Sequence, residues 1–135
     1  MDWISRLEKL NGVIDQYIAL ANQGIENQVM PPKVLMSRVL NQIKLQNVDS
    51  YINSPFYDAF EVLPDEISNQ EQEQIREQAQ ITITNVVIPS YVKLLTFFEN
   101  SYYPNCRDTI GISDIKNGSQ YYELIARQFT TCLLY

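Results

Sequence analysis

The stretch between Ser68 and Pro104 constrains the fold of this chain more than any other. It opens with Ser68 and Glu71, which match the Ser-x-x-Glu capping box that starts helices. Apolar residues then recur at helical steps and share one stripe, namely Ile75, Ala79, Ile83, Val86, Val87, Tyr91, Leu94, Leu95 and Phe98. The pattern predicts one long helix from about Asn69 to Tyr102.

Two features inside this stretch complicate the prediction. Pro89 has no backbone N–H, so it should remove the bond to the Asn85 carbonyl and kink the helix. The segment ITITNVVI, residues 81–88, is rich in β-branched residues and partly alternates, which favours a strand. A strand is the alternative for this segment. The helix is the main prediction because a strong helix former precedes it with no turn residue between.

Further helical segments flank the long one. Apolar spacing predicts a first helix over residues 2–24 with Gly24 as its stop, and a second over 31–47 with Pro31 and Pro32 in its first turn. A short helix is expected between Pro55 and Pro64. A last helix should follow the Asn117-Gly118 turn, capped by Ser119. We therefore predict a single all-α domain over residues 1–135, a helical bundle-like fragment with three longer helices and one or two short ones.

Charge and composition exclude several classes of protein. The 135 residues carry 10 Lys and Arg against 16 Asp and Glu, a net charge of −6, and no basic cluster. Such a chain is a poor ligand for nucleic acid or anionic membranes. No apolar run approaches the roughly 18 residues of a membrane span, so no transmembrane segment is expected. The polar N-terminus shows no signal peptide, which leaves the location open and favours the cytoplasm.

The residues needed for common catalytic chemistry are scarce. The sequence has no histidine and only two cysteines, Cys106 and Cys132, and we expect these to be separate free thiols. Acidic neighbours such as Asp108 and Asp114 are interpreted as solvated surface. The prediction for this chain is no catalytic residue, no metal ligand set and no cofactor.

One constellation of residues stands out as a candidate binding site. The loop FFENSYYPNCRDTIGIS holds Arg107, and the following segment KNGSQYYELIARQFTT holds Tyr121, Tyr122 and Arg127. In the functional interpretation these four residues form a pocket wall, where Arg127 holds a substrate carboxylate and the tyrosine hydroxyls orient a bound peptide. In the structural alternative, Arg107 caps helix-end carbonyls or pairs with Asp108, and a tight, glycine-dependent loop docks two helices.

Several motifs resemble those of the bacterial domain of unknown function 885 family. They are PPKVLMSRVLNQI, SPFYDAF and VIPSYVKLLTFFENSYYPNCRDTIGISDIKNGSQYYELIARQFTT. The matching positions are Pro89, Tyr91, Leu94, Tyr103, Pro104, Arg107, Gly111, Ser113, Asn117, Gly118, Tyr121, Tyr122, Arg127, Thr130 and Thr131. Family members are several times longer and carry a His-Glu-x-x-Pro-Gly-His segment that resembles a zinc peptidase motif. The resemblance therefore implies a middle piece of such a protein, with zinc and a peptide substrate belonging to the full-length form.

Two functional hypotheses follow from these observations. The first is the non-catalytic helical portion of a zinc-dependent hydrolase or peptidase, and the second is a stand-alone helical protein-interaction module. Under the first, apolar faces that the rest of the protein covers should be exposed here. We expect exposed Tyr122, Ile125 and Phe129, with residues 133–135, and association through the last ~15 residues, either as a homo-oligomer or with the missing remainder.

Overall fold

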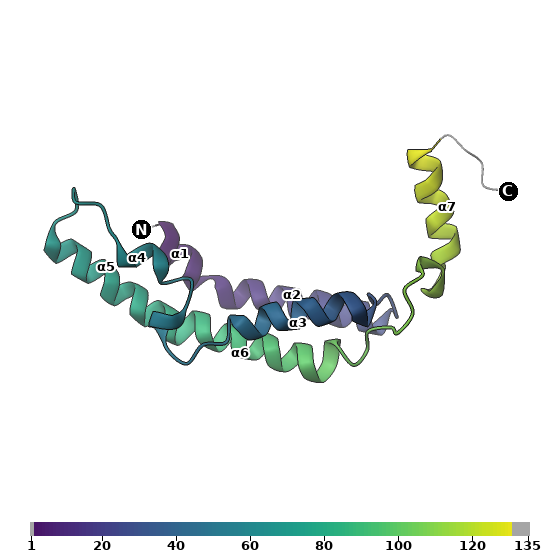
Figure 1. The fold of residues 1–135 in the computed structure, drawn as a ribbon, viewed down its shortest axis with the longest axis horizontal. Coiled ribbons are helices and arrows are strands. Elements are labelled where there is room, and N and C mark those ends of the chain that lie inside the picture. The colour runs from purple at the N-terminus through teal and green to yellow at the C-terminus, as the bar shows by residue number, and fades with distance from the viewer. Residues whose placement is uncertain (1, 131–135) are drawn as a thin grey trace.

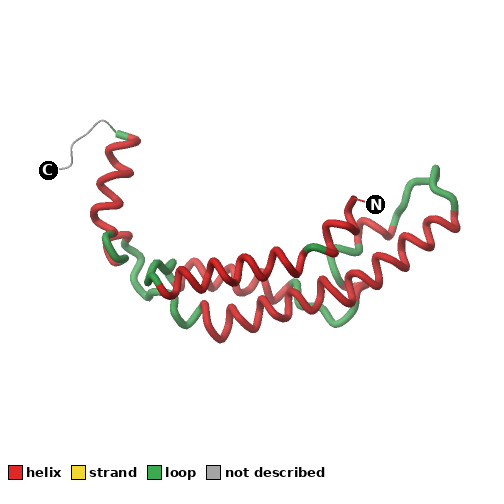
Figure 2. Tube along the Cα trace, turned by 180° about the vertical axis from the view of Figure 1, so that it is seen from behind, coloured by secondary structure: helices red, strands yellow, loops and turns green. Residues whose placement is uncertain are grey.

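The structure, a computed structural model, describes residues 2–130 and is an elongated, curved bundle of helices (Figure 1). Within these residues there is no strand, which confirms the predicted all-α class. Figure 2 shows the same arc from behind, with helices along most of its length and loops both at its ends and beside its middle. The helix nearest the C-terminus stands away from the arc in both views. Thr131, Cys132 and the apolar residues 133–135 named above lie outside the described residues.

The helices occupy the following ranges of the chain. They are α1 (Asp2–Glu8), α2 (Leu10–Glu26), α3 (Lys33–Leu45), α4 (Asp58–Glu61), α5 (Asn69–Thr82), α6 (Ile88–Phe97) and α7 (Gly118–Phe129). Short 3₁₀ turns lie at Tyr51–Asn53 and Ile112–Asp114, and π-helical segments at Ile83–Val87 and Phe98–Tyr102. The short helix expected between Pro55 and Pro64 is the single turn α4, which buries Phe60.

The long helix predicted from Asn69 to Tyr102 is confirmed as one rod made of α5, α6 and the two π-helical segments. Its capping box is formed as expected. The Glu71 N–H donates to Ser68 Oγ at 3.3 Å, and the Ser68 N–H donates to Glu71 Oε2 at 3.2 Å. The strand alternative for residues 81–88 is wrong, because the helix that starts at the capping box continues through them.

The backbone around Pro89 departs from regular α-helix in the turn before the proline. The Ile88 N–H bonds to the Ile83 carbonyl, five residues back, so the turn is wider than an α-turn. Ser90 Oγ donates to the Val86 carbonyl at 2.6 Å. A π-segment next to a proline is a recognised cause of helix bending, and the rod is visibly curved in both views.

The first predicted helix is divided and ends later than expected. The chain turns at Lys9, whose N–H bonds to the Arg6 carbonyl at 3.1 Å, and α2 then continues to Glu26. Gly24 lies inside α2 and does not stop it. Asn27 Nδ2 caps the Gln23 carbonyl at 2.7 Å, and Gln28 adopts the left-handed conformation at φ 59°, so the helix ends without a glycine.

Two further terminus predictions are wrong. Ser119 lies inside α7, whose first residue is Gly118 and whose cap position is Asn117, at φ 59°. Glycine is required at 118 because a Cβ there would lie 1.8 Å from the Ile112 carbonyl oxygen. Pro31 and Pro32 do not lie in a first turn either, since Pro32 is the extended residue just before α3.

The core lies where α1 and α4 pack on the middle of the rod. It is centred on Ile83 and Val87, which are 0% and 1% exposed. The other buried members of this cluster are Ile4, Leu7, Phe60 and Ala79. The rod is the common wall of the bundle, because α1, α2, α3 and α4 all contact it.

The length and apolar composition of the 69–102 rod would allow it to cross a membrane, with a window hydropathy of 1.5. Only 28% of that window is buried within the described residues. The buried part is the side that contacts α1, α2 and α3. Length and composition therefore do not distinguish a membrane span from the core helix of a bundle, and α1, α2, α3 and α4 all contact this rod.

Candidate functional site

Arg107 joins two segments that are far apart in the sequence. Its Nε donates to the Met30 carbonyl at 3.0 Å, and its Nη1 donates to the carbonyls of Thr109, at 2.9 Å, and Gly111, at 2.5 Å. The guanidinium thus binds the segment before α3 and also the backbone of its own loop, at Thr109 and Gly111. A planar group with five donors suits this task, because its separate nitrogens Nε and Nη1 reach carbonyls of two different segments, whereas lysine offers a single nitrogen.

The backbone reinforces the same junction. The Arg107 N–H donates to the Pro31 carbonyl at 3.2 Å, and the Lys33 N–H donates to the Arg107 carbonyl at 2.8 Å. Next to it, Lys33 Nζ forms an ion pair with Asp108 Oδ1 at 3.0 Å. Of the two structural alternatives for Arg107, the pair with Asp108 is not formed, because the Arg107 side chain turns toward the backbone carbonyls of Met30, Thr109 and Gly111 instead.

Tyr121, Tyr122 and Arg127 lie on α7, and all three side chains are exposed. The two tyrosines keep 51% and 54% of their accessible surface. Within residues 2–130 no hydrogen bond, ion pair or ring contact joins any of the three to Arg107. The four candidate residues therefore occupy two separate places, the Arg107 junction and the surface of α7.

The expected docking of two helices by the loop is wrong for α7. Its main contact is with the 3₁₀ turn at Ile112–Asp114, and the helix projects from the end of the bundle (Figures 1 and 2). Gly118 makes that contact, as its missing Cβ leaves room for the Ile112 carbonyl. Gly111 has an ordinary φ of −62°, so the glycine dependence of this loop belongs to Gly118.

A shallow hollow opens beside Arg107. Its volume is about 340 Å³. The lining residues are Ile25, Gln28, Met30, Asn105, Arg107, Asp114 and Ile115. It places one guanidinium and one carboxylate at the same opening. Two of the guanidinium nitrogens already bond to carbonyls of the protein, so most of the donor capacity of Arg107 serves the fold.

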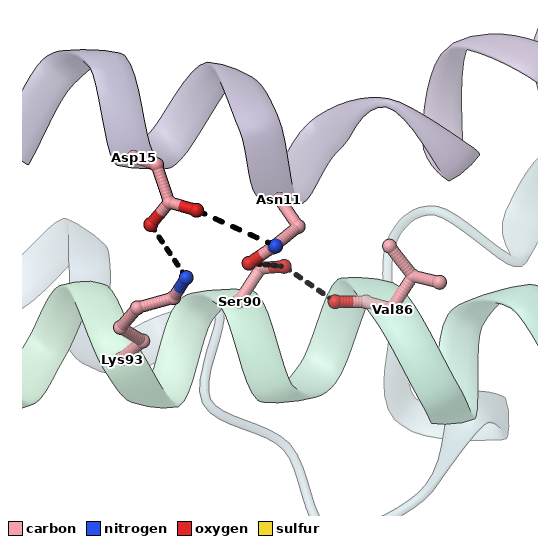
Figure 3. Close-up of polar contacts among 5 residues, drawn as sticks. All are labelled: Asn11, Asp15, Val86, Ser90 and Lys93. Carbon is pink, nitrogen blue, oxygen red and sulfur yellow. Dashed lines mark hydrogen bonds and ion pairs between the residues drawn. The ribbon is translucent and has the colours of Figure 1, made fainter.

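A polar cluster between α2 and α6 was not predicted. Lys93 Nζ pairs with Asp15 Oδ1 at 2.5 Å, and Asn11 donates to Asp15 Oδ2 at 3.5 Å (Figure 3). Ser90 Oγ, which bonds to Val86, lies 3.5 Å from Asn11 Oδ1. The spacing of Asn11 and Asp15, four residues apart on one helix face, was the sequence signal that could have indicated this cluster. The cluster fixes the register of α2 along the rod, and the buried Ser90, at 1% exposure, is no accessible nucleophile.

The thiol of Cys106 is suited to packing. Burial raises its pKa, an effect that the nearby charge of Lys33 partly opposes. The side chain is 4% exposed, and Sγ lies 3.4 Å from the Tyr102 carbonyl. Burial likewise raises the pKa of Tyr102. A neutral, buried thiol is a poor nucleophile and a poor metal ligand.

The described residues do not fit a zinc site. Residues 2–130 contain no group of three or more His, Cys, Asp or Glu side chains placed to hold a metal ion. The whole sequence lacks histidine, the commonest zinc ligand besides cysteine. No catalytic step through a metal can be derived from this set of donors.

A family model described as "Bacterial protein of unknown function (DUF885)" matches residues 1–134. No curated protein and no solved structure matches the chain. The match covers the Arg107 junction and α7 alike, so both features lie within the region that the family model describes.

Proposed function

The chain belongs to the DUF885 family of bacterial proteins, and from this premise we propose that it is the non-catalytic helical portion of a zinc-hydrolase-like protein. In this proposal the bundle is a scaffold, and α7 carries one wall of a substrate cleft that is completed by other parts of the protein. The zinc ligands have to come from those other parts, because this chain offers no suitable group of donors among residues 2–130.

The observation that carries the proposal is the exposure of apolar side chains on α7. This helix is amphipathic, and its apolar stripe is formed by Tyr122, Ile125 and Phe129. Tyr122 keeps 54% and Phe129 78% of its accessible surface, as expected from the sequence, while Ile125 is half-buried. Isolated helices of this length are marginal in water, and their stability comes from packing of the apolar face. A partner surface for α7 is thus part of the proposal.

The candidate binding residues fit the same arrangement. By helical spacing, Tyr121 borders the apolar stripe of α7 and Arg127 lies on the opposite face, so Arg127 remains accessible when Phe129 is covered. Arg127 can then hold a carboxylate of a bound peptide, and Tyr121 can donate a hydrogen bond to another part of that peptide. Arg107 takes a different role here, since it holds the loop from which α7 starts.

A second candidate is a protein-interaction module that works without a catalytic portion. The observation in its favour is the outer face of α2, where exposed apolar residues lie in a region almost free of charge. In this case α7 and α2 are both binding surfaces, and no hydrolytic activity is associated with the assembly.

The test is to mix the purified chain with a segment of a longer DUF885 protein that carries the His-Glu motif. Expected are a stable complex and hydrolysis of a peptide panel that neither component shows alone. Phe129→Glu should abolish the complex, and Leu45→Glu, on an exposed part of α3, should not. A complex without hydrolysis supports the interaction module. No complex at all contradicts the proposed role of α7.

A further inference from the structure

The dipeptide Asn-Gly occurs twice in the sequence, at residues 11–12 and at residues 117–118. In such a pair the backbone nitrogen of the glycine can attack the asparagine side chain with little hindrance, because glycine has no side chain of its own. The reaction removes the side-chain amide and is called deamidation. The two pairs lie in different surroundings, so the fold decides which of them reacts.

The first pair lies within a helix of the bundle. Asn11 and Gly12 belong to α2, which packs on α6. Asn11 Nδ2 donates to Asp15 Oδ2 at 3.5 Å, and Asn11 Oδ1 accepts from Ser90 Oγ at 3.5 Å (Figure 3). Both ends of the side-chain amide are thus engaged. Deamidation here requires that α2 open locally within the bundle.

The second pair lies at the exposed turn that starts α7. The side chain of Asn117 is exposed and makes no capping hydrogen bond to α7. The Gly118 N–H donates to the Ile115 carbonyl at 2.9 Å, so its nitrogen is engaged while the turn is closed. The main contact of α7 is with the turn at Ile112–Asp114. A segment with so few contacts opens at a low free energy, and opening frees the nitrogen.

From this contrast we propose that Asn117 is a site of spontaneous deamidation, and that the product releases α7 from the bundle. The Gly118 nitrogen gives its proton to hydroxide and forms a bond to Cγ of Asn117. The bond from Cγ to Nδ2 breaks, and Nδ2 takes a proton from water and leaves as ammonia. Water then opens the succinimide ring. Opening at Cγ gives ordinary aspartate, and opening at the backbone carbonyl gives isoaspartate, whose chain continues through Cγ.

The isoaspartate product does not fit the junction of α7. It adds a methylene group to the main chain directly before Gly118. The backbone of Gly118 lies so close to the Ile112 carbonyl that even a Cβ there would be 1.8 Å from its oxygen. A shift of Gly118 therefore separates α7 from the 112–114 turn. The proposal does not depend on the partner proposed for α7, since the reaction needs only the opening of this turn.

The test follows deamidation of the complete chain during incubation at mildly alkaline pH. Trypsin separates the two pairs into peptides 10–33 and 117–127, and mass spectrometry with fragmentation assigns the modified position. In the folded chain, position 117 should react at least about 10-fold faster than position 11, because α2 opens at a higher free energy than the start of α7. In urea the two rates should be similar. Equal rates in the folded chain, or unequal rates in urea, would overturn the assignment to the fold.

Two variants test the release of α7, which is measured by proteolysis around residue 112. In the incubated wild type, cleavage should rise with the isoaspartate content. Asn117→Gln should show no such rise, because glutamine cyclises far more slowly, and Gln28 already adopts the same left-handed backbone in this chain. Freshly purified Asn117→Asp carries the charge of the aspartate product on an ordinary backbone, so it should keep α7 in place.

Two results would refute the release. One is incubated wild type that contains isoaspartate and is cleaved no faster than the fresh chain. The other is fresh Asn117→Asp that is cleaved as fast as the incubated wild type, because the added charge and not the longer backbone would then displace α7.

Discussion

Replacement of Arg107 separates its structural role from a binding role. In Arg107→Ala the carbonyls of Met30, Thr109 and Gly111 each lose a hydrogen bond. Bonds from a charged donor contribute roughly 1.5–3 kcal/mol each when buried. Two of these three hydrogen bonds are exposed to solvent. Each of those two should therefore contribute only about 1 kcal/mol to the free energy of unfolding. The expected loss is about 3.5–5 kcal/mol in the free energy of unfolding, measured by urea denaturation.

The conservative replacement sharpens this test. In Arg107→Lys one ammonium group replaces the planar fork and can reach only part of the carbonyl set, so we expect a loss of about 1–2 kcal/mol. The control is Arg127→Ala, an exposed arginine of α7, which should change stability by less than about 0.5 kcal/mol. If Arg107→Ala is as stable as the wild type, the junction does not hold the fold and the argument is refuted.

Four further predictions concern the core, the α7 junction, the capping box and metal. Ile83→Ala should lower the free energy of unfolding by about 2–5 kcal/mol, because Ile83 is fully buried. Ile81 is half-exposed, so Ile81→Ala should lower the free energy of unfolding far less. Similar losses for the two variants would contradict the assignment of the core. Gly118→Ala should displace α7 and increase proteolysis around residue 112, because its Cβ would collide with the Ile112 carbonyl, whereas Gly12→Ala, with nothing within 4 Å, should stabilise α2 by about 0.5–1 kcal/mol. Hydrogen bonds from the side chain and backbone of Ser68 lower the pKa of Glu71 below 4.5. The contribution of Glu71 to stability is therefore present above pH 4.5 and is lost as the pH falls through the lowered pKa. Glu71→Gln should flatten this part of the pH profile of the free energy of unfolding, and an unchanged profile would count against the capping box. The purified chain should bind no stoichiometric zinc, since three suitable donors do not converge within residues 2–130, and elemental analysis that finds about one zinc per chain would refute this.

Local signals in the sequence predict the long rod well. The capping box at Ser68 and Glu71 fixes its start, and the unbroken helical spacing carries it through the β-branched segment 81–88. In that segment propensity favours a strand, but the context of a continuing helix is stronger. The π-helical turn at 83–87 could not be predicted, because it depends on the combined effect of Pro89 and of the packing around the buried Ile83 on the backbone hydrogen bonds.

Helix ends are predicted less well, because several neighbouring residues could each cap or stop the helix. Gly24 is a good stop signal, yet Asn27 and Gln28 end α2 three residues later with a side-chain cap and a left-handed residue. Ser119 is a good cap signal, but the collision that only Gly118 avoids decides where α7 begins. These outcomes depend on contacts with Ile112 and Gln23 that single-sequence patterns do not contain.

The candidate site shows the same limit. The sequence singles out Arg107, Tyr121, Tyr122 and Arg127 as a group because they lie close together along the chain, but proximity in sequence does not place them together in space. Arg107 points back toward Met30, 77 residues away in sequence. In the polar cluster, the spacing of Asn11 and Asp15 is a local signal, but the pairing of Asp15 with Lys93 is a long-range contact that the local spacing does not indicate.

The central claim is that the apolar face of α7 is largely uncovered within residues 2–130. Amide hydrogen exchange of the chain by itself, below the concentration at which it associates, tests this claim most directly. The account predicts that amides of residues 121–129 exchange far faster than those of residues 75–90, because α7 contacts little beyond the 112–114 turn. If residues 121–129 are protected as strongly as the rod, α7 is packed within its own chain and the proposed function is contradicted.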